Sequence, residues 1–215
     1  MSETEPKLGK EDAEILEERE SGMSSRTQLV LKIAGAAIFG ALSILLSFLA
    51  PLLIRVGPGM AIFDPVSIPW TTCFIIFGPL AGVLCAVIGF VGLIPFDTSI
   101  PVVGPFMKFM ATFSLIIIYI VVLRLYKKEE GKLQRPKLKK PTNYVLVGIL
   151  AIGFRLVVME ILNIIVYIWL GLPIAGLPTW LIWVAIINSI QSIWDLAIPY
   201  LLIFPTKLNE IFEIW

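Results

Sequence analysis

The chain has 215 residues, of which 58% are hydrophobic and 15% charged, with a formal net charge of +1. Its mean hydropathy of +0.91 is far above that of soluble domains and favours a membrane protein. It contains no histidine, which argues against an intramembrane metalloenzyme because the commonest proton shuttle and metal ligand is missing. Its basic residues gather in one segment instead of on a soluble surface, so no nucleic-acid partner is predicted.

Residues 1–28 form a mostly acidic segment that mixes charged residues with Gly and Ser. It has too few apolar residues to bury, so we expect a disordered cytoplasmic tail. No signal peptide is predicted, because a basic start followed by a short apolar core is absent. Residues 29–205 are expected to form a single membrane domain, followed by a short cytoplasmic tail at 206–215.

The membrane domain contains six apolar segments separated by polar or Pro/Gly-rich turns, at residues 29–53, 61–77, 80–94, 103–123, 144–170 and 180–204. A helix needs about 20 apolar residues to cross a bilayer, so the pattern predicts an all-α membrane protein built as a six-transmembrane-helix bundle. The second and third segments are short and rich in Pro and Gly. We expect them to be tilted or partly re-entrant, with other helices covering their backbone groups.

Basic residues set the orientation of the bundle. The segment 124–140 holds eight Lys and Arg residues and two Glu residues, whereas Arg55 is the only basic residue in the loops on the opposite side. The positive-inside rule therefore places this segment and both termini in the cytoplasm. Four indole rings fall near the predicted outer helix ends, where such rings favour the interface: Trp70, Trp169, Trp180 and Trp183. The absence of a targeting peptide fits the plasma membrane of a prokaryote.

Ionisable side chains inside a bilayer cost at least ~2.5–3.5 kcal/mol near its centre, so each predicts a role. Those in the apolar segments are Asp64, Lys108, Arg155, Glu160 and Asp195, with Asn163, Asn188 and Gln191 as polar neighbours. Counting from the outer ends of the last two spans places six of these side chains at three matched depths: Asn163 with Asn188, Glu160 with Gln191, and Arg155 with Asp195.

The deepest pair, Arg155 with Asp195, is expected to be a structural ion pair that holds the last two helices in register. The two outer levels, together with Lys108, are predicted to line a ligand pocket. Glu160 has no second carboxylate at a useful helical spacing, and no motif marks a nucleophile, so we expect no enzyme activity, cofactor or metal. Cys73 and Cys85 both lie in apolar segments and are interpreted as packing residues instead of a disulfide.

The first span carries small residues four apart on two adjacent strips, Ala36 with Gly40 and Ala37 with Ala41. Such faces let helix backbones approach closely in lipid. Two interpretations stay open: packing inside the bundle, or a docking face for another membrane subunit.

Several short motifs occur in a recognisable order. They are Asp-Pro-x-Ser-Ile-Pro at 64–69, Phe-Gly-Pro-Leu-Ala-Gly at 77–82, Gly-Pro at 104–105 and Asn-x-x-Gln at 188–191. Together with the small-residue first span, they resemble the substrate-binding S components of energy-coupling factor (ECF) vitamin transporters. The resemblance covers residues 29–205. Within the family, the Asp-x-x-x-x-Pro and Gly-Pro-x-x-x-Phe patterns are most similar to riboflavin-type members.

The resemblance implies a six-helix protein that binds a water-soluble vitamin near the outer face, in a pocket closed by the loop after the first span. The implied substrate-binding residues are Asp64, Phe106, Lys108, Glu160, Asn163, Asn188 and Gln191. It also implies partners, a transmembrane coupling subunit and two cytoplasmic ATPases, with the coupling subunit contacting Ala37 and Ala41 and the adjacent Ala36 and Gly40.

Two rival hypotheses belong to other functional classes. In the first, an autonomous secondary transporter or channel uses Glu160, Arg155 and Asp195 as a charge relay, although six spans without a detectable inverted repeat are few for that task. In the second, a scaffolding membrane protein uses the small-residue face of the first span to bind its partners.

Overall fold

The computed structural model describes residues 24–49, 52–57, 60–96, 100, 102–126 and 136–208. The predicted N-terminal tail up to residue 23, most of the basic segment and the last seven residues lie outside this part. The elements in chain order are α2 (Ser25–Ser47), β1 (Arg55–Val56), β2 (Met60–Ala61), α3 (Ile68–Phe77), α4 (Pro79–Leu93), η2 (Ile94–Phe96), α5 (Val103–Tyr126), α6 (Pro136–Lys139), α7 (Pro141–Trp169), η4 (Ile174–Gly176) and α8 (Leu177–Ile203).

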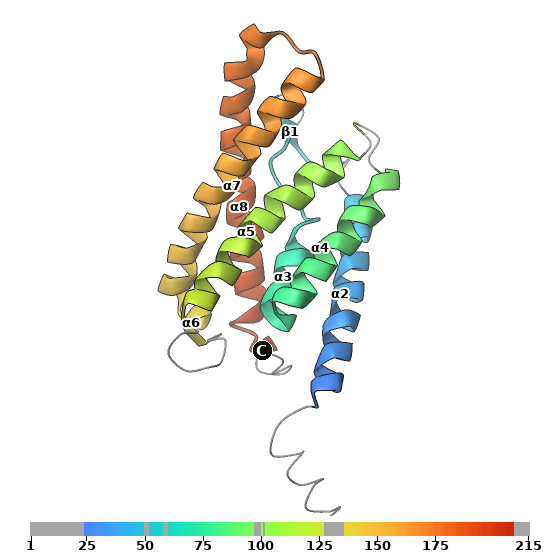
Figure 1. The fold of residues 1–215 in the computed structure, drawn as a ribbon, viewed down its shortest axis with the longest axis vertical. Helices are drawn as coiled ribbons and strands as arrows, with labels where there is room; N and C mark the ends of the chain where they lie inside the picture. The colour runs from blue at the N-terminus through green and yellow to red at the C-terminus, as the bar shows by residue number, and fades with distance from the viewer. Residues whose placement is uncertain are drawn as a thin grey trace, which may run out of the picture.

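Five helices in the described ranges, α2, α4, α5, α7 and α8, are long and apolar enough to cross a membrane. α2, α4 and α7 run toward one end of the bundle, and α5 and α8 run back in the opposite direction (Figure 1). α2 packs on α4, α4 on α5, α5 on α7 and α7 on α8. The helical, multi-pass character predicted from composition is therefore present.

The helix of the second apolar segment, α3, is the central helix of the bundle. It contacts α2, α4 and α8, and nine of its residues are buried: Pro69, Trp70, Thr71, Thr72, Cys73, Phe74, Ile75, Ile76 and Phe77. A helix that is apolar all round has no face suited to water, so burial on every side is the arrangement its sequence favours.

The second apolar segment was predicted at 61–77 as a short span, tilted or partly re-entrant, and within it α3 is only ten residues long. At about 1.5 Å per residue it covers about 15 Å, half of an apolar bilayer core. Pro65 disfavours helical conformation at Asp64, and Pro69 stands in the first turn of α3, where a helix tolerates proline, so both explain the late start. The Asp64 Oδ1 atom accepts a hydrogen bond from the Val66 N–H at 3.1 Å, which stabilises a turn instead.

The first helix also differs from its predicted bounds. α2 begins at Ser25, inside the segment predicted to be disordered, and ends at Ser47 instead of residue 53. The chain then forms a short antiparallel hairpin in which Arg55 pairs with Ala61 and Val56 with Met60. This hairpin replaces the irregular loop that the sequence predicted.

The turn between α3 and α4 explains the Phe-Gly-Pro-Leu-Ala-Gly motif. Gly78 has φ +95°, a conformation that favours glycine, and Pro79 opens α4 at a position where its missing N–H costs nothing. A Cβ on Gly82 would lie 2.6 Å from the Phe74 Cβ, so glycine is needed for the close approach of the two helices.

The two small-residue strips of α2 have different surroundings. Ala36 is 1% exposed, and a Cβ added to the buried Gly40 would lie 2.7 Å from Ile88 Cγ2 of α4. Ala37 and Ala41 are exposed. The first strip therefore packs inside the bundle, and only the second offers a surface.

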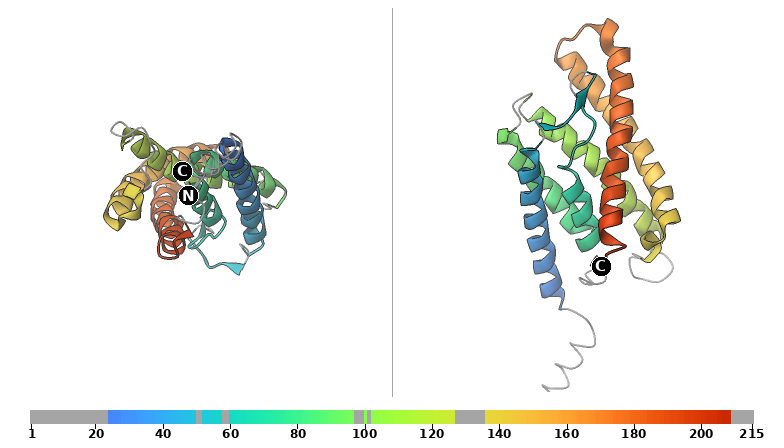
Figure 2. Two further views of the ribbon diagram at one scale, coloured as in Figure 1. Left: turned by 90° about the horizontal axis from the view of Figure 1, so that it is seen from below. Right: turned by 180° about the vertical axis from the view of Figure 1, so that it is seen from behind.

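The two ends of the bundle differ in charge. The β1–β2 hairpin, η2 and η4 lie toward one end, hereafter the hairpin end; the start of α2, the Gly78 turn, α6 and the end of α8 lie at the other, hereafter the basic end (Figures 1 and 2). Described basic residues at the basic end include Arg124, Lys139, Lys140 and Lys207. This grouping is the asymmetry on which the predicted membrane orientation rests.

Candidate ligand-binding site

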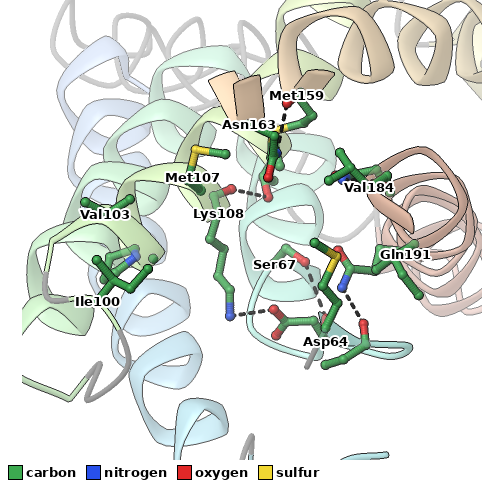
Figure 3. A pocket seen from close by; sticks show the side chains of 18 of the residues that line it. Asp64, Ser67, Ile100, Val103, Met107, Lys108, Met159, Asn163, Val184 and Gln191 are labelled. Carbon is green, nitrogen blue, oxygen red and sulfur yellow. Dashed lines mark hydrogen bonds and ion pairs between the residues drawn. The ribbon is translucent and has the colours of Figure 1, made fainter. Parts of the chain in front are cut away.

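A cavity of about 420 Å³ opens between the hairpin, α5, α7 and α8. This volume is within the range of small-molecule sites. Its wall comes from segments far apart in the sequence, and side chains from α5, α7 and α8 point into it together with those of the segment before α3 (Figure 3). The residues whose roles are discussed below are Arg55, Met60, Ala61, Asp64, Ser67, Met107, Lys108, Arg155, Met159, Asn163, Trp180, Asn188 and Gln191.

Five of the seven predicted substrate-binding residues line this cavity: Asp64, Lys108, Asn163, Asn188 and Gln191. The other two do not. Phe106 is 39% exposed, and its ring meets the edge of Phe90 with centroids 6.4 Å apart. Glu160 is half-buried and follows Met159, which faces the cavity, so about 100° of helical rotation turns it away.

Arg155 is fully buried and joins α7 to three side chains of α8. Its Nη1 lies 2.6 Å from Asp195 Oδ2, and both side chains are 2% exposed. Its Nε and Nη2 each donate a hydrogen bond of 3.2 Å, to Asn188 Oδ1 and to Gln191 Oε1. The structure thus brings the predicted pair together, and the same guanidinium also holds the two amides predicted at shallower levels.

The buried carboxylate extends this network to α3. Ser67, the residue before α3, donates from its Oγ to Asp195 Oδ1 at 2.5 Å. Each carboxylate oxygen of Asp195 therefore has a donor, one from α7 and one from the start of the central helix. A buried charge needs such partners, and here they fix three helices relative to one another.

The hairpin is attached to α8 at two points. Gln191 Nε2 donates a hydrogen bond of 2.6 Å to the backbone oxygen of Ala61 in β2. Gly57, with φ +55°, packs so closely on Trp183 that an added Cβ would lie 2.5 Å from the indole ring. Trp183, predicted near an outer helix end, supports the hairpin through this contact. The Gly-Pro-Gly sequence at 57–59 was the signal for a tight turn here.

An ion pair crosses the cavity wall. Lys108 Nζ in α5 lies 2.5 Å from Asp64 Oδ2, with side chains 25% and 15% exposed (Figure 3). Both residues were predicted to belong to the site, but their pairing was not predicted. Asp64 lies in an irregular segment, so its depth in the membrane cannot be counted from a helix end.

The apolar part of the wall includes three methionines and an indole that belong to one cluster: Met60, Met107, Met159 and Trp180. Methionine adapts its shape and makes favourable sulfur contacts with aromatic rings, so this wall suits a flat ring. The Trp180 Nε1–H donates to Asn163 Oδ1 at 3.2 Å, and Asn163 Nδ2 donates to the Met159 backbone oxygen at 2.8 Å. Asn163 therefore positions Trp180; no bond to Asn188, its predicted partner in depth, is found.

Within the described ranges, no group of three or more Cys, Asp and Glu side chains is arranged to hold a metal ion. The polar groups at the cavity are amides, hydroxyls and paired charges. They can donate and accept hydrogen bonds to a bound molecule and orient it.

Comparison of the chain with models of known protein families, with curated proteins and with solved structures finds no match. Functional inference therefore rests on the cavity, its lining and the motif order of this chain.

The attachment of the hairpin gives a first prediction. Gln191→Met keeps the length of the side chain but leaves the Ala61 carbonyl without its donor, at a cost of about 1–3 kcal/mol. We expect the hairpin to open more often, so that trypsin cleaves after Arg55 several-fold faster, as followed by mass spectrometry of the fragments. Ser189→Ala is the matched control, because that hydroxyl bonds only within α8, to the Ala185 oxygen. Equal cleavage rates after Arg55 in both variants would show that Gln191 does not hold the hairpin.

Proposed function

We propose that this chain is the substrate-binding S component of an ECF-type importer in a prokaryotic plasma membrane. In this proposal it captures a water-soluble vitamin at the outer face, and riboflavin is the favoured candidate. It performs no chemistry and does not hydrolyse ATP; a transmembrane coupling subunit and two cytoplasmic ATPases supply the energy. All six segments contribute to the domain, with both termini in the cytoplasm.

The observation that carries the proposal is the place of the cavity. It lies toward the hairpin end, away from the basic end that the positive-inside rule assigns to the cytoplasm. A site in this position is reached from outside. The hairpin that follows α2 forms part of its wall, and α5, α7 and α8 supply the rest, as the resemblance to S components implies.

The composition of the wall supports an aromatic vitamin. Met60, Met107, Met159 and Trp180 offer an apolar slot, and the paired Lys108 and Asp64 offer polar contacts beside it. A few well-placed polar groups in a mainly apolar pocket are the usual composition of small-molecule sites.

The exposed strip of α2 supports the proposed partner. Ala37 and Ala41 are exposed one turn apart, with nothing larger than a methyl group at either position. In lipid, small residues four apart let a neighbouring helix approach closely. A coupling subunit docked on this strip would leave the cavity untouched, because α2 contributes only Ser47 at its end to the lining.

The experiment that tests the proposal is a ligand titration of the purified protein. Riboflavin, thiamine, biotin and pantothenate are added in turn while tryptophan fluorescence is followed, because Trp180 lies in the wall. We expect riboflavin to bind with a submicromolar Kd. Trp180→Phe should lose much of the signal while flavin fluorescence still reports binding. Micromolar or weaker binding of all four compounds would overturn the vitamin assignment.

A second measurement separates this proposal from autonomous transport. The chain alone is placed in liposomes and uptake of the bound compound is measured, with and without an ion gradient. We expect no uptake, since Arg155 and Asp195 satisfy each other in a buried pair and Glu160 lies on another face of α7. Uptake without any partner would favour a secondary transporter.

A further inference from the structure

In the Lys108–Asp64 pair, two opposite charges meet in the cavity wall within reach of a bound molecule. Both side chains line the cavity and retain partial exposure, 25% and 15%. The carboxylate is fully engaged, because Oδ2 lies 2.5 Å from Lys108 Nζ and Oδ1 accepts the Val66 N–H. The pair holds α5 against the segment that leads into α3.

The other charges of the wall are already placed. Arg155 borders the cavity, but it and Asp195 form a pair with 2% exposure on each side, so each charge is already neutralised by the other. Arg55 lies on the hairpin and is exposed, so water and salt screen its charge. A ligand inside the cavity therefore meets charge mainly from Lys108 and Asp64.

This arrangement opposes a charged ligand of either sign. An anion that took Lys108 would leave Asp64 without its partner in a sheltered site, and breaking such a pair is strongly unfavourable. An anion that left the pair intact would meet the carboxylate at short range, where screening is weak. The same reasoning, with signs reversed, excludes a cation.

An uncharged ligand leaves the pair intact and still gains from it. An ammonium group has three N–H donors, and one carboxylate oxygen needs only one of them. The remaining donors can reach a carbonyl or hydroxyl oxygen of the ligand. Its ring then occupies the slot formed by Met60, Met107, Met159 and Trp180.

We propose that the Lys108–Asp64 pair is a charge filter: beside this pair the site takes an uncharged aromatic ring compound with carbonyl or hydroxyl acceptors and rejects its phosphorylated or carboxylated counterpart. This inference rests on the proposed function and narrows its substrate class. Asp64 and Lys108 are both specificity-determining residues in it.

Two pairs of compounds that differ in charge test the filter in the purified full-length protein: riboflavin and riboflavin 5′-phosphate, and nicotinamide and nicotinate. A phosphate ester carries about −1.5 to −2 charges at neutral pH. For each pair that binds, we expect the uncharged member to bind at least about tenfold more tightly, because the anionic member must either separate Lys108 from Asp64 or lie beside the carboxylate.

Asp64→Asn is the decisive variant. It keeps an oxygen to accept the Val66 N–H but removes the charge that neutralises Lys108. The affinity for the anionic member, relative to that for the uncharged member, should rise by at least about tenfold. In the double variant Asp64→Asn/Lys108→Met, this shift should disappear. Melting temperatures of both variants confirm that the bundle is intact.

The outcomes separate the two proposals. Equal affinity of the wild-type protein for both members of a pair, or an unchanged ratio in Asp64→Asn, would overturn the charge filter and leave vitamin binding standing. If no member of any pair binds and the four-vitamin titration is also negative, the proposed function fails and the filter fails with it.

Discussion

Replacing Arg155 with alanine is expected to destabilise the bundle by about 3–5 kcal/mol, the range found when one partner of a buried ion pair is removed. The guanidinium satisfies Asp195, Asn188 and Gln191 at once, and its side chain is 2% exposed. Without it, the carboxylate keeps only the Ser67 hydroxyl as a donor. A loss of this size is a large part of the stability of a small domain.

The measurement is the melting temperature in detergent, with the yield of monodisperse protein as a second readout. Arg124→Ala, an exposed position at the basic end of α5, serves as the control for loss of an arginine. The double variant Arg155→Leu/Asp195→Leu should be more stable than Arg155→Ala, because no buried charge is left without a partner. It should remain below the wild type, since Ser67 and the two amides of α8 lose partners. A single variant as stable as the wild type would show that the pair contributes nothing to the fold.

This pair was predictable from the sequence because its geometry is local. Two antiparallel helices joined by a short loop advance by a fixed rise, so depth can be counted from their shared end. Counting places Arg155 and Asp195 level with each other, and the structure brings them to 2.6 Å. The tight turn at Gly78 is similarly local: positive φ and the following proline fix it without help from the rest of the chain.

Depth alone does not give the direction in which a side chain points. Glu160 was placed at the level of Gln191, but the face of α7 that lines the cavity passes through Arg155, Met159 and Asn163. The phase of a helix within a bundle depends on all of its neighbours. An apolar helix such as α7 carries little asymmetry in its sequence to reveal that phase.

Non-local contacts also decide the second apolar segment and the hairpin. Composition alone predicted a span at 61–77, yet hydrogen bonds from α8 reach Ala61 and, through Asp195, Ser67. These bonds compensate a stretch of irregular backbone that lipid would not tolerate. Trp70 shows a similar effect: predicted at the interface, it is fully buried, and its ring lies where a Cβ on Gly89 would be only 2.4 Å from Nε1.

The two strips of α2 allow a matched pair of double variants, one residue apart on the same helix. Ala37→Leu/Ala41→Leu enlarges the exposed strip, so we expect a folded protein that binds its ligand normally but no longer assembles with a coupling subunit. Ala36→Leu/Gly40→Leu enlarges the buried strip. There a single Cβ at Gly40 already approaches Ile88 to 2.7 Å, and overpacking costs about 1–3 kcal/mol at each site.

Three readouts distinguish the strips: melting temperature, ligand titration and uptake in cells that supply the coupling subunit and ATPases. The exposed-strip variant should lose uptake alone, whereas the buried-strip variant should lose stability and, with it, binding. The exposed-strip variant adds six carbons and the buried-strip variant seven, and Gly40→Leu raises helix propensity, so a lower stability of the buried-strip variant cannot come from altered helix propensity or hydrophobicity. Normal uptake by the exposed-strip variant would remove α2 as the docking surface. Equal destabilisation of the two variants would instead show that Ala37 and Ala41 also pack within the bundle, because larger side chains destabilise a protein by overpacking only where neighbouring atoms already fill the space.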